Sequence, residues 1–520
     1  MHSRRLLSWY FLVPSLFVTA GMVIPLAYLL VRAFQADLSV VGDLVFRARN
    51  AHLLFNTIGL ATGVLAVASA IALPLAWLTA RTDLPGRGFI TLAGVLPLAI
   101  PGYVLAYALI AATGMRGTIA GLLGVPIPRP GGFTGSLIAL SIYTFPYLFL
   151  NIRAALLGLD PALEESARAL GYRPTQVFLR LTLPQLRPGF YAGALLVGLH
   201  VLGDFGVVSL MRFETFSYAL YLQYTASYDR IYAAWLALIL LGLTGAALAT
   251  EARLLRGLVL HRTGTGTHRR STSTHLGLWS APAYLFVGAV LAISVAVPVT
   301  TVVHWLAAGS AAPSWADLGR ALASSVTASA PAAVLSAFVA MAIAYLSVRM
   351  HSPLSRLLER IAYFGYATPP LAFALALIFF TLHVAPLFYQ TLLLLILAYA
   401  LHFLAEAMGP VRTALYQASP RLEEAARSLG MRPLSAFFSA TFPLLRRGVL
   451  VGVAFVFLSA MKELPITFLL SPTGFVTLAM GVWSNANEAL FSRAAPFALV
   501  IIVFSAVFVG LLLLHEQRSR

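Results

Sequence analysis

Four ionisable residues stand inside long apolar stretches of the sequence: Asp204, Glu406, Lys462 and Glu463. A charged side chain inside a membrane is costly and usually faces a cavity or a charged partner. Asp204 and Glu463 lie 259 residues apart, at equivalent positions of two similar parts of the chain. We expect these carboxylates, and less directly Glu406 and Lys462, to line a route for a positively charged or metal-bearing substrate. The alternative is that they pair with Lys462, Arg212 or backbone groups where helices unwind.

Other kinds of site find little support in the sequence. The chain contains no cysteine, which excludes disulfides and thiolate metal sites. Four histidines stand singly on apolar stretches, His200, His304, His383 and His402, and none is assigned as a metal ligand. The only lysine is Lys462, and no glycine-rich turn precedes it as a P-loop requires. We therefore expect no catalytic residue and no cofactor bound by this chain.

Two polar segments, 160–189 and 419–448, share 16 of 30 residues without a gap. In each segment a good helix N-cap, Asp160 or Ser419, precedes a proline at the first helical position. Gly171 and Gly430 stand where a residue in the left-handed conformation would end the helix. Each polar segment is therefore predicted to form a helix, a glycine corner and a second short helix outside the bilayer.

The first helices of the polar segments carry acidic and small residues at matched positions: Glu164, Glu165 and Ala167 in the first, and Glu423, Glu424 and Ala426 in the second. For one copy, an amphipathic pair resting on lipid headgroups would be a sufficient explanation. Two copies with the same caps, acids and glycine corner favour a docking surface for a two-fold symmetric partner.

The elements that must position these residues are membrane helices. Only 10% of the residues are charged and 60% are hydrophobic, and many apolar runs reach the length of about 20 residues that crosses a bilayer. Isolated strands would leave backbone groups unsatisfied in lipid. The chain is therefore predicted to be an all-α, polytopic membrane protein. Its twelve predicted spans lie near 9–33, 53–80, 88–112, 135–157, 190–211, 231–250, 279–306, 322–348, 358–383, 388–414, 447–470 and 494–514. Five prolines are predicted to kink or break these helices: Pro97, Pro101, Pro369, Pro370 and Pro465.

The distribution of positive charge predicts the orientation in the membrane. The formal net charge is +17, and most of the basic residues fall beside loops that the twelve-span arrangement assigns to the cytoplasm. This asymmetry follows the positive-inside rule, so no nucleic-acid partner is expected. Both termini and both polar segments are predicted to be cytoplasmic. The apolar run after the basic amino terminus is longer than a signal-peptide core, so it is predicted to be a retained first span, with cleavage as the alternative.

The repeat predicts two halves of similar architecture. The first repeat covers 1–255, a polar linker rich in Gly, Ser and Thr covers 256–278, and the second repeat covers 279–520. Each half holds six predicted spans, so both enter the membrane in the same direction. Parallel repeats of this kind are related by an axis along the membrane normal. We expect a transport pathway between them.

The second polar segment resembles the EAA loop of ABC importer permeases. Residues 424–443 have the pattern of that loop: Glu-Ala-Ala, three residues, Gly, nine residues, an apolar residue, one more, a hydrophobic residue and Pro. Residues 165–184 fit the same spacing, with Ser166 in place of the first Ala and Leu181 in the apolar position. The resemblance implies a type I importer permease fold in which each loop forms a coupling helix. It implies that two ATP-binding cassette subunits dock on these loops. ATP would be bound and hydrolysed by those subunits.

A finer resemblance is to the fused permeases of ferric-iron importers. Residues 203–221 and 462–483 resemble the segments that follow each EAA loop in that family, although Ser471 stands where an arginine is common and 211–213 lack the usual glycine. The resemblance implies a periplasmic iron-binding protein as partner and the bacterial inner membrane as location. One alternative is the same machine carrying thiamine, a polyamine or another small solute. Two others are an ion-coupled secondary transporter of the major-facilitator type and a purely structural membrane scaffold.

Overall fold

The computed structural model describes residues 2–35, 38–226, 230–256, 274–309, 313–350 and 352–518. Within these ranges the chain forms helices joined by loops, and its only β-feature there is an isolated parallel bridge between Thr82 and Thr274. The all-α class predicted from the sequence is confirmed. Most of the predicted linker at 256–278 lies outside the described residues, and so do residues 1 and 519–520 at the two ends.

The number of membrane spans agrees with the prediction. Eight helices of the described residues are long and apolar enough to cross a membrane, and the number rises to 12 if each of four bent helix pairs is one span. The second polar segment differs in one respect from the expected separate short helix. Its second helix continues into the following span, so that 433–461 form one apolar element.

The chain divides into two compact units, each described here by itself. Unit 1 consists of Met1–Arg47, Ala219–Leu241 and Pro313–Gly481. Its helices are α1 (His2–Ala33), α2 (Leu38–Val45), α17 (Trp315–Met350), α18 (Pro353–Ala367), α19 (Pro370–Val384), α20 (Leu392–His402), α21 (Leu404–Gln417), α22 (Pro420–Ser428), α23 (Pro433–Ala436), α24 (Phe442–Met461) and α25 (Pro465–Leu470).

Unit 2 consists of Ala48–Tyr218, Gly242–Ala312 and Val482–Arg520. Its helices are α3 (Ala48–Arg81), α4 (Arg87–Val95), α5 (Gly102–Ala112), α6 (Thr118–Leu123), α7 (Gly132–Gly158), α8 (Pro161–Ala169), α9 (Pro174–Val177), α10 (Leu183–Gln185), α11 (Arg187–Gly203), α12 (Gly206–Leu210), α15 (Ser280–Leu291), α16 (Val297–Ala308) and α27 (Phe491–Arg518). Three helices contribute residues to both units: α13 (Phe216–Ala226), α14 (Arg230–Leu254) and α26 (Leu478–Asn487).

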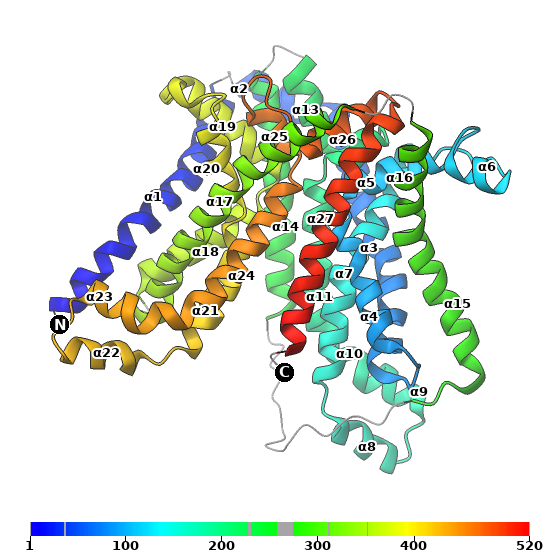
Figure 1. Ribbon diagram of the computed structural model, residues 1–520, viewed down its shortest axis with the longest axis horizontal. Coiled ribbons are helices and arrows are strands. Elements are labelled where there is room, and N and C mark those ends of the chain that lie inside the picture. Colours follow the sequence, from blue (N-terminus) through cyan, green and yellow to red (C-terminus); the bar gives the residue numbers. More distant parts are fainter. Residues whose placement is uncertain are drawn as a thin grey trace. The chain divides into compact units, whose positions relative to one another are not determined.

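The units do not coincide with the predicted sequence repeats 1–255 and 279–520, because each unit takes its first span, and residues of its last span, from the other half. In unit 1, α1 packs on α17, α18 and α19, which follow it by about 280 residues or more (Figure 1). In unit 2, α16 packs on α5 and α27, and α15 contacts α3 and α4. The repeat boundaries remain a prediction about the sequence, while the packing follows a different division.

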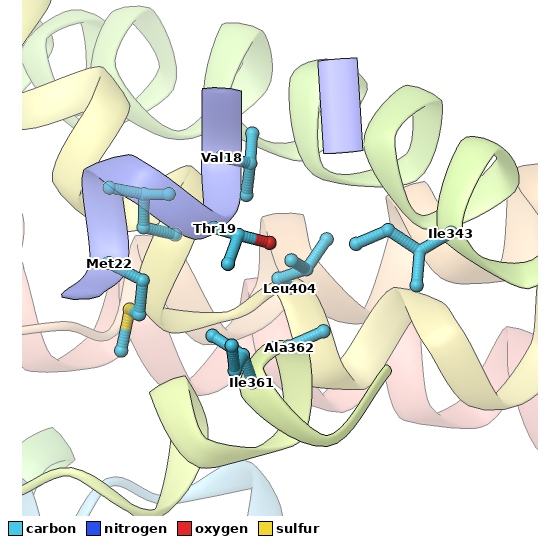
Figure 2. A pocket seen from close by; sticks show the side chains of 8 residues that line it. Val18, Thr19, Met22, Ile343, Ile361, Ala362 and Leu404 are labelled. Atoms are coloured by element: carbon cyan, nitrogen blue, oxygen red, sulfur yellow. The ribbon is translucent and has the colours of Figure 1, made fainter. Parts of the chain in front are cut away.

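The packing of α1 is close and apolar. Figure 2 shows Val18, Thr19 and Met22 of α1 gathered with residues of α17, α18 and α21 around a small cavity of about 10 Å³. On α18, a Cβ atom added to Gly365 would lie 2.8 Å from the Met22 side chain. A glycine at this point lets the two helices approach each other, as small residues do in membrane helix pairs.

The sharpest bends lie at matched places in the two halves. The axis turns by 93° between Arg87–Ala99 and α5, and by 109° between α18 and α19. Pro101 precedes α5, and Pro369 and Pro370 stand at the start of α19. Proline lacks a backbone N–H and therefore interrupts the helical hydrogen bonds. The predicted breaks at these prolines are confirmed.

Candidate functional site

The first helix of each polar segment begins where the sequence predicts it. Asp160 precedes α8, and its carboxylate accepts a hydrogen bond from the backbone N–H of Ala162 at 3.0 Å. Ser419 precedes α22, and its hydroxyl accepts one from the backbone N–H of Arg421 at 3.4 Å. The two caps satisfy backbone donors that have no partner within the first turn of a helix.

Both helices end at a glycine corner. Gly171 and Gly430 each have a φ angle of 86°, in the left-handed region that glycine adopts without the cost of a Cβ atom. The same backbone hydrogen bond closes both corners, from the residue after the glycine back into the helix: Tyr172 to Ala167 and Met431 to Ala426, each at 3.2 Å. This is the six-to-one bond of a Schellman motif, and it gives Ala167 and Ala426 their part in the corner.

The first glutamate of each pair is bonded to its own polar segment. The hydroxyl of Thr182 donates to Glu164 Oε1 at 3.0 Å, and the hydroxyl of Thr441 donates to Glu423 Oε2 at 3.1 Å. Each threonine is the last residue of a π-helical turn, η2 (Phe178–Thr182) or η6 (Phe437–Thr441). Such turns are rare and frequent at functional sites. The bond joins the two arms of each corner and so fixes the angle at which the corner is presented.

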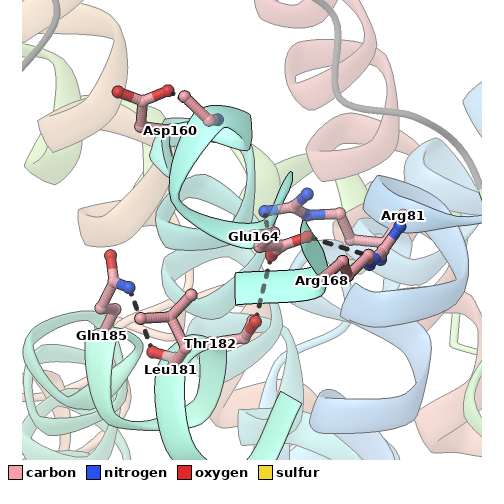
Figure 3. A network of polar contacts seen from close by, with 8 residues as sticks. Arg81, Asp160, Glu164, Arg168, Leu181, Thr182 and Gln185 are labelled. Atoms are coloured by element: carbon pink, nitrogen blue, oxygen red, sulfur yellow. Dashed lines mark hydrogen bonds and ion pairs between the residues drawn. The ribbon is translucent and has the colours of Figure 1, made fainter. Parts of the chain in front are cut away.

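The two polar segments differ in what else holds this glutamate. In the first, Arg81 Nη2 lies 3.2 Å from Glu164 Oε1, and Arg168 approaches Oε2 at 4.0 Å (Figure 3). In the second, the hydroxyl of Tyr345 donates to Glu423 Oε1 at 2.8 Å. The Glu423 residue is only 5% exposed. The first corner is therefore anchored by ion pairs and the second by a buried hydrogen-bond network.

The other face of each corner is open to a partner. Glu165 and Glu424 are exposed. Leu170 and Leu429, which directly precede the corner glycines, are 79% and 85% exposed. One exposed leucine needs no explanation, whereas the same large apolar residue at both corners indicates a contact surface.

Asp204 lies at a helix break in unit 2. Its Oδ1 accepts hydrogen bonds from the backbone N–H groups of Val207 (2.9 Å) and Val208 (3.2 Å), which open α12. Its other oxygen, Oδ2, lies 3.6 Å from the place that a Cβ atom of Gly102 would occupy, at the start of α5. Asp204 therefore bonds to the backbone where one helix unwinds and borders the break before another.

Glu463 has the same arrangement in unit 1. Its Oε1 accepts a hydrogen bond from the backbone N–H of Ile466 at 2.8 Å, in the first turn of α25. Its backbone carbonyl accepts a hydrogen bond from the hydroxyl of Thr467 at 2.7 Å. The alternative to a pathway role, that these acids bond to backbone groups at helix breaks, holds for one oxygen of each carboxylate. Among the described residues, no hydrogen bond reaches Asp204 Oδ2 or Glu463 Oε2.

Glu406 and Lys462 come together in unit 1. Glu406 Oε1 accepts a hydrogen bond from the Ser459 hydroxyl at 2.9 Å, and its carboxylate interacts electrostatically with Lys462. Lys462 therefore interacts with Glu406. Asp204 lies in unit 2 and the other three ionisable residues lie in unit 1. Over the described part of the chain, no group of three His, Asp or Glu residues is arranged to hold a metal ion.

The equivalent place in unit 2 has another chemistry. Tyr147 and His200 are separated by 259 residues from Glu406 and Ser459, respectively. The Tyr147 and His200 rings lie 4.4 Å apart, centroid to centroid. Each half thus places a contacting pair on the equivalent two helices, hydrogen-bonded in unit 1 and aromatic in unit 2.

Sequence reasoning missed four residues that shape the corners: Arg81, Thr182, Tyr345 and Thr441. A signal existed for the threonines, because they are among the residues identical in both polar segments. A weaker signal existed for the others, since 71–81 and 339–349 align at a spacing of 268 residues, with an arginine at the end of each. The contacts that these residues make are between distant parts of the chain and are not encoded in local pattern.

Residues 72–250 and 334–520 each match a family of proteins described as "Binding-protein-dependent transport system inner membrane component". The two matched ranges together cover more than half of the chain, and each contains one polar segment.

Individual relatives differ in how much of the chain they match. The chain is 31% identical to the Fe(3+)-transport system permease protein FbpB 2 of Haemophilus influenzae over 495 residues, which cover 94% of this chain and 95% of that protein. It is 36% identical to the molybdenum transport system permease protein ModB of Escherichia coli over 133 residues, 25% of this chain and 58% of ModB. It is 25% identical to the sulfate transport system permease protein CysW of Escherichia coli over 221 residues, 41% of this chain and 76% of CysW.

Proposed function

Because this chain belongs to the binding-protein-dependent transport system inner membrane components, we propose that it is the fused permease that carries ferric iron in an ABC importer. It is a multi-pass inner-membrane permease with two family repeats on one chain. The cargo, the partner subunits and the orientation of the termini are the parts of this function that we infer.

One observation carries the choice of cargo. The similarity to the ferric-iron permease extends over 94% of the chain and therefore includes both repeats. The similarities to the molybdenum and sulfate permeases cover 25% and 41% of it. Similarity over a single repeat is what the shared machinery of the family explains, whereas similarity over both repeats includes the pathway as well.

The charges inside the spans support a cationic cargo. Asp204, Glu406 and Glu463 place three carboxylates on membrane helices, against the single ammonium of Lys462. Carboxylate oxygens attract a metal cation and repel an oxyanion such as molybdate or sulfate. We propose that Asp204 and Glu463 line the route with the carboxylate oxygens that accept no backbone hydrogen bond. Glu406 and Lys462 form a second, weaker part of it.

The corners support two ATP-binding cassette partners, one on each polar segment. Their docking residues are the exposed acids and leucines around Gly171 and Gly430, with Glu164 and Glu423 holding the shape from behind. ATP is then bound and hydrolysed by those partners, and this chain has no catalytic residue or cofactor of its own. A periplasmic iron-binding protein delivers the cargo from the other side. Both termini lie in the cytoplasm with the corners.

The experiment that tests the cargo is uptake into proteoliposomes that contain the permease, its ATPase and its binding protein. The expected result is ATP-dependent accumulation of labelled ferric iron and none of thiamine, molybdate or sulfate. ATP-dependent uptake of thiamine, molybdate or sulfate instead of ferric iron would support the importer but contradict the proposed cargo. Ferric uptake that persists without the ATPase, or that follows an ion gradient, would point to a secondary transporter and overturn the proposal.

Replacing Asp204 and Glu463 tests whether these acids line the transport pathway. Asp204→Asn and Glu463→Gln keep an oxygen that accepts the backbone hydrogen bond, and they remove the negative charge. Each substitution is expected to remove a charged contact with the ferric ion that contributes about 1.5–3 kcal/mol. Ferric uptake should therefore slow about tenfold or more. Asp317→Asn is the matched control, because Asp317 pairs with Arg320 at the exposed start of α17. Normal uptake by both variants, in complexes that still assemble, would remove these acids from the pathway.

A further inference from the structure

A groove runs along one side of unit 2 behind the first corner. Its polar end is a cavity of about 510 Å³ lined by Arg81, Glu164 and Arg168 together with Trp77 and Phe178. A second cavity of about 360 Å³ shares Trp77 and Phe178 and continues along α3 and α7. The two cavities are therefore adjacent, and together they are called the groove below.

The lining of this groove changes from apolar to charged along its length. The second cavity is lined only by apolar residues, among them Leu73 of α3 and Ile152 and Leu156 of α7, which belong to two apolar spans. The other end is at Arg81, the last residue of α3, and at the first corner (Figure 3). A groove with this gradient matches an amphipathic molecule that lies along a membrane helix with its charged end at the surface.

The charged end has an excess of positive charge. Arg81 and Arg168 face one carboxylate, that of Glu164. The Arg81 side chain is only 7% exposed, and among the described residues its Nε atom has no hydrogen-bond partner. A buried guanidinium with an unused N–H is unfavourable, and carboxylates and phosphates are the groups that its geometry fits.

The space behind the second corner, which is the counterpart of this groove, is filled by a side chain of the chain itself. Tyr345 and Phe437 occupy the positions equivalent to Trp77 and Phe178. The ring of Phe11, from α1, lies 4.5 Å from the Tyr345 ring and 5.0 Å from the Phe437 ring, centroid to centroid. Phe11 is 5% exposed, so the space behind the second corner is occupied by the chain itself.

Two residues that line the cavities of the first segment are smaller than their counterparts in the second segment. Leu179 and Leu183 stand where the second segment has Phe438 and Phe442, so each pair differs by an aromatic ring. Both leucines are exposed, at 59% and 38%.

The first span of the second half supplies no substitute for Phe11. When Pro14 and Pro282 are aligned, the residue that corresponds to Phe11 is Trp279. Trp279 is 74% exposed and does not line either cavity. Within the described part of the chain, the groove behind the first corner is therefore open at the place where its counterpart is closed.

We propose that this groove binds one anionic glycerophospholipid, with an acyl chain along Trp77 and Phe178 and the phosphate at Arg81 and Arg168. The lipid supplies the apolar contacts that Phe11 supplies in the other half, and its phosphate satisfies the Arg81 N–H. Since Arg81 also pairs with Glu164, the bound lipid lies directly behind the first corner and stabilises it. The proposal concerns this chain alone and does not depend on the cargo.

Native mass spectrometry of the purified full-length chain tests this site, with phosphatidylglycerol and phosphatidylcholine as separate probes and inorganic phosphate as competitor. The wild-type chain is expected to retain one phosphatidylglycerol about tenfold more strongly than phosphatidylcholine. Leu179→Phe combined with Leu183→Phe introduces the aromatic residues of the second segment and is expected to abolish this adduct. Arg168→Gln is expected to remove the preference for phosphatidylglycerol while leaving weak binding of both lipids.

Leu150→Phe is the matched control, because Leu150 is an exposed leucine of α7 that lines neither cavity; it is expected to keep the adduct. Arg168→Gln changes a surface residue and gives an answer even if the double variant does not purify as a single species. Equal retention of the two lipids by the wild-type chain, or an adduct that survives in the double variant, overturns the proposal. So does displacement by inorganic phosphate alone, which would mean a free-anion site. A lipid adduct that appears only in Trp279→Ala would mean that Trp279 fills the groove instead.

Discussion

Tyr147 and His200 stand where the other half has Glu406 and Ser459, and both pairs are in contact within their own unit. The duplicated chain has thus kept the place of a contact and changed its chemistry. Glu164 and Glu423 show the opposite behaviour, since the acid and its threonine partner are kept. The proposed function accounts for this difference: two corners that dock the same kind of partner would need one geometry, whereas a single cargo would need only one route inside the membrane.

The corner glycines give a direct prediction. Gly430→Ala forces a Cβ atom into a conformation with φ of 86°, which costs about 1–2 kcal/mol. We expect about fivefold to thirtyfold faster hydrogen exchange in 419–433, and a partial recovery in Gly430→Asn because asparagine tolerates this conformation. Gly242→Ala is the control, since Gly242 lies within α14 with open space around it. Unchanged exchange in Gly430→Ala would mean that the corner does not depend on glycine.

At the scale of elements, a short clasp joins the loop after α3 to the residues before α15. The backbone N–H of Thr274 donates to the Arg81 carbonyl at 2.8 Å, and the N–H of Leu276 donates to Asp83 Oδ1 at 3.0 Å. The ring of His275 lies 2.5 Å from Asp83 Oδ2. Because Arg81 also pairs with Glu164, the clasp places the start of the second half beside the first corner.

The clasp is expected to open in acid. The Leu276 N–H, together with the nearby His275, holds the pKa of Asp83 below its usual value of about 3.9. A carboxyl whose pKa is lower in the folded state stabilises that state above its unfolded pKa, and this stabilisation is lost as pH falls through the folded pKa. Hydrogen exchange in 274–279, corrected for its intrinsic pH dependence, should therefore stay slow at pH 5–7 and accelerate below about pH 4. Asp83→Ala should be fast throughout and Asp317→Asn should behave as the wild type; slow exchange in Asp83→Ala would refute the clasp.

Structural features that depend on neighbouring residues could be predicted from the sequence. Features that depend on contacts between distant parts of the chain could not. The caps at Asp160 and Ser419 and the corner glycines act on their immediate neighbours, so residue type and spacing were sufficient. The Tyr345–Glu423 hydrogen bond joins residues 78 positions apart, and nothing in either stretch specifies it. The exchange of first spans was missed for a related reason. Apolar composition predicts that a helix spans the membrane, but it does not indicate which other helix it packs against.

At the scale of the whole molecule, the two corners have similar exposed faces but are held by different contacts on their buried sides. Leu170 and Leu429 repeat on the exposed side, while ion pairs hold one corner and the Tyr345 network holds the other. The proposed pair of ATPases would therefore bind two nearly identical surfaces whose supports differ in chemistry, one an ion-pair network and the other a hydrogen-bond network.

Charge placed on either corner should remove one ATPase. Burial of a leucine contributes about 1.5–3 kcal/mol, so Leu170→Glu or Leu429→Glu should weaken docking at its own corner about tenfold or more. Native mass spectrometry of the copurified complex should find two ATPases with the wild-type chain, one with each single variant and none with the double variant. Leu122→Glu, on the exposed helix α6, is the control that keeps both. Two ATPases on the double variant would place the docking surface elsewhere.

The exchange of first spans has a consequence for biosynthesis. The ribosome completes α1 long before α17, which begins about 280 residues later, an interval of about 15–60 seconds at ordinary translation rates of about 5–20 residues per second. During that time the apolar face of α1 that finally covers α17–α19 is solvated by lipid tails alone. Unit 2 in turn waits for α27. Unit 1 is complete only when Gly481 has been made and unit 2 only when α27 has been made, so both units of this permease reach their native packing late in translation.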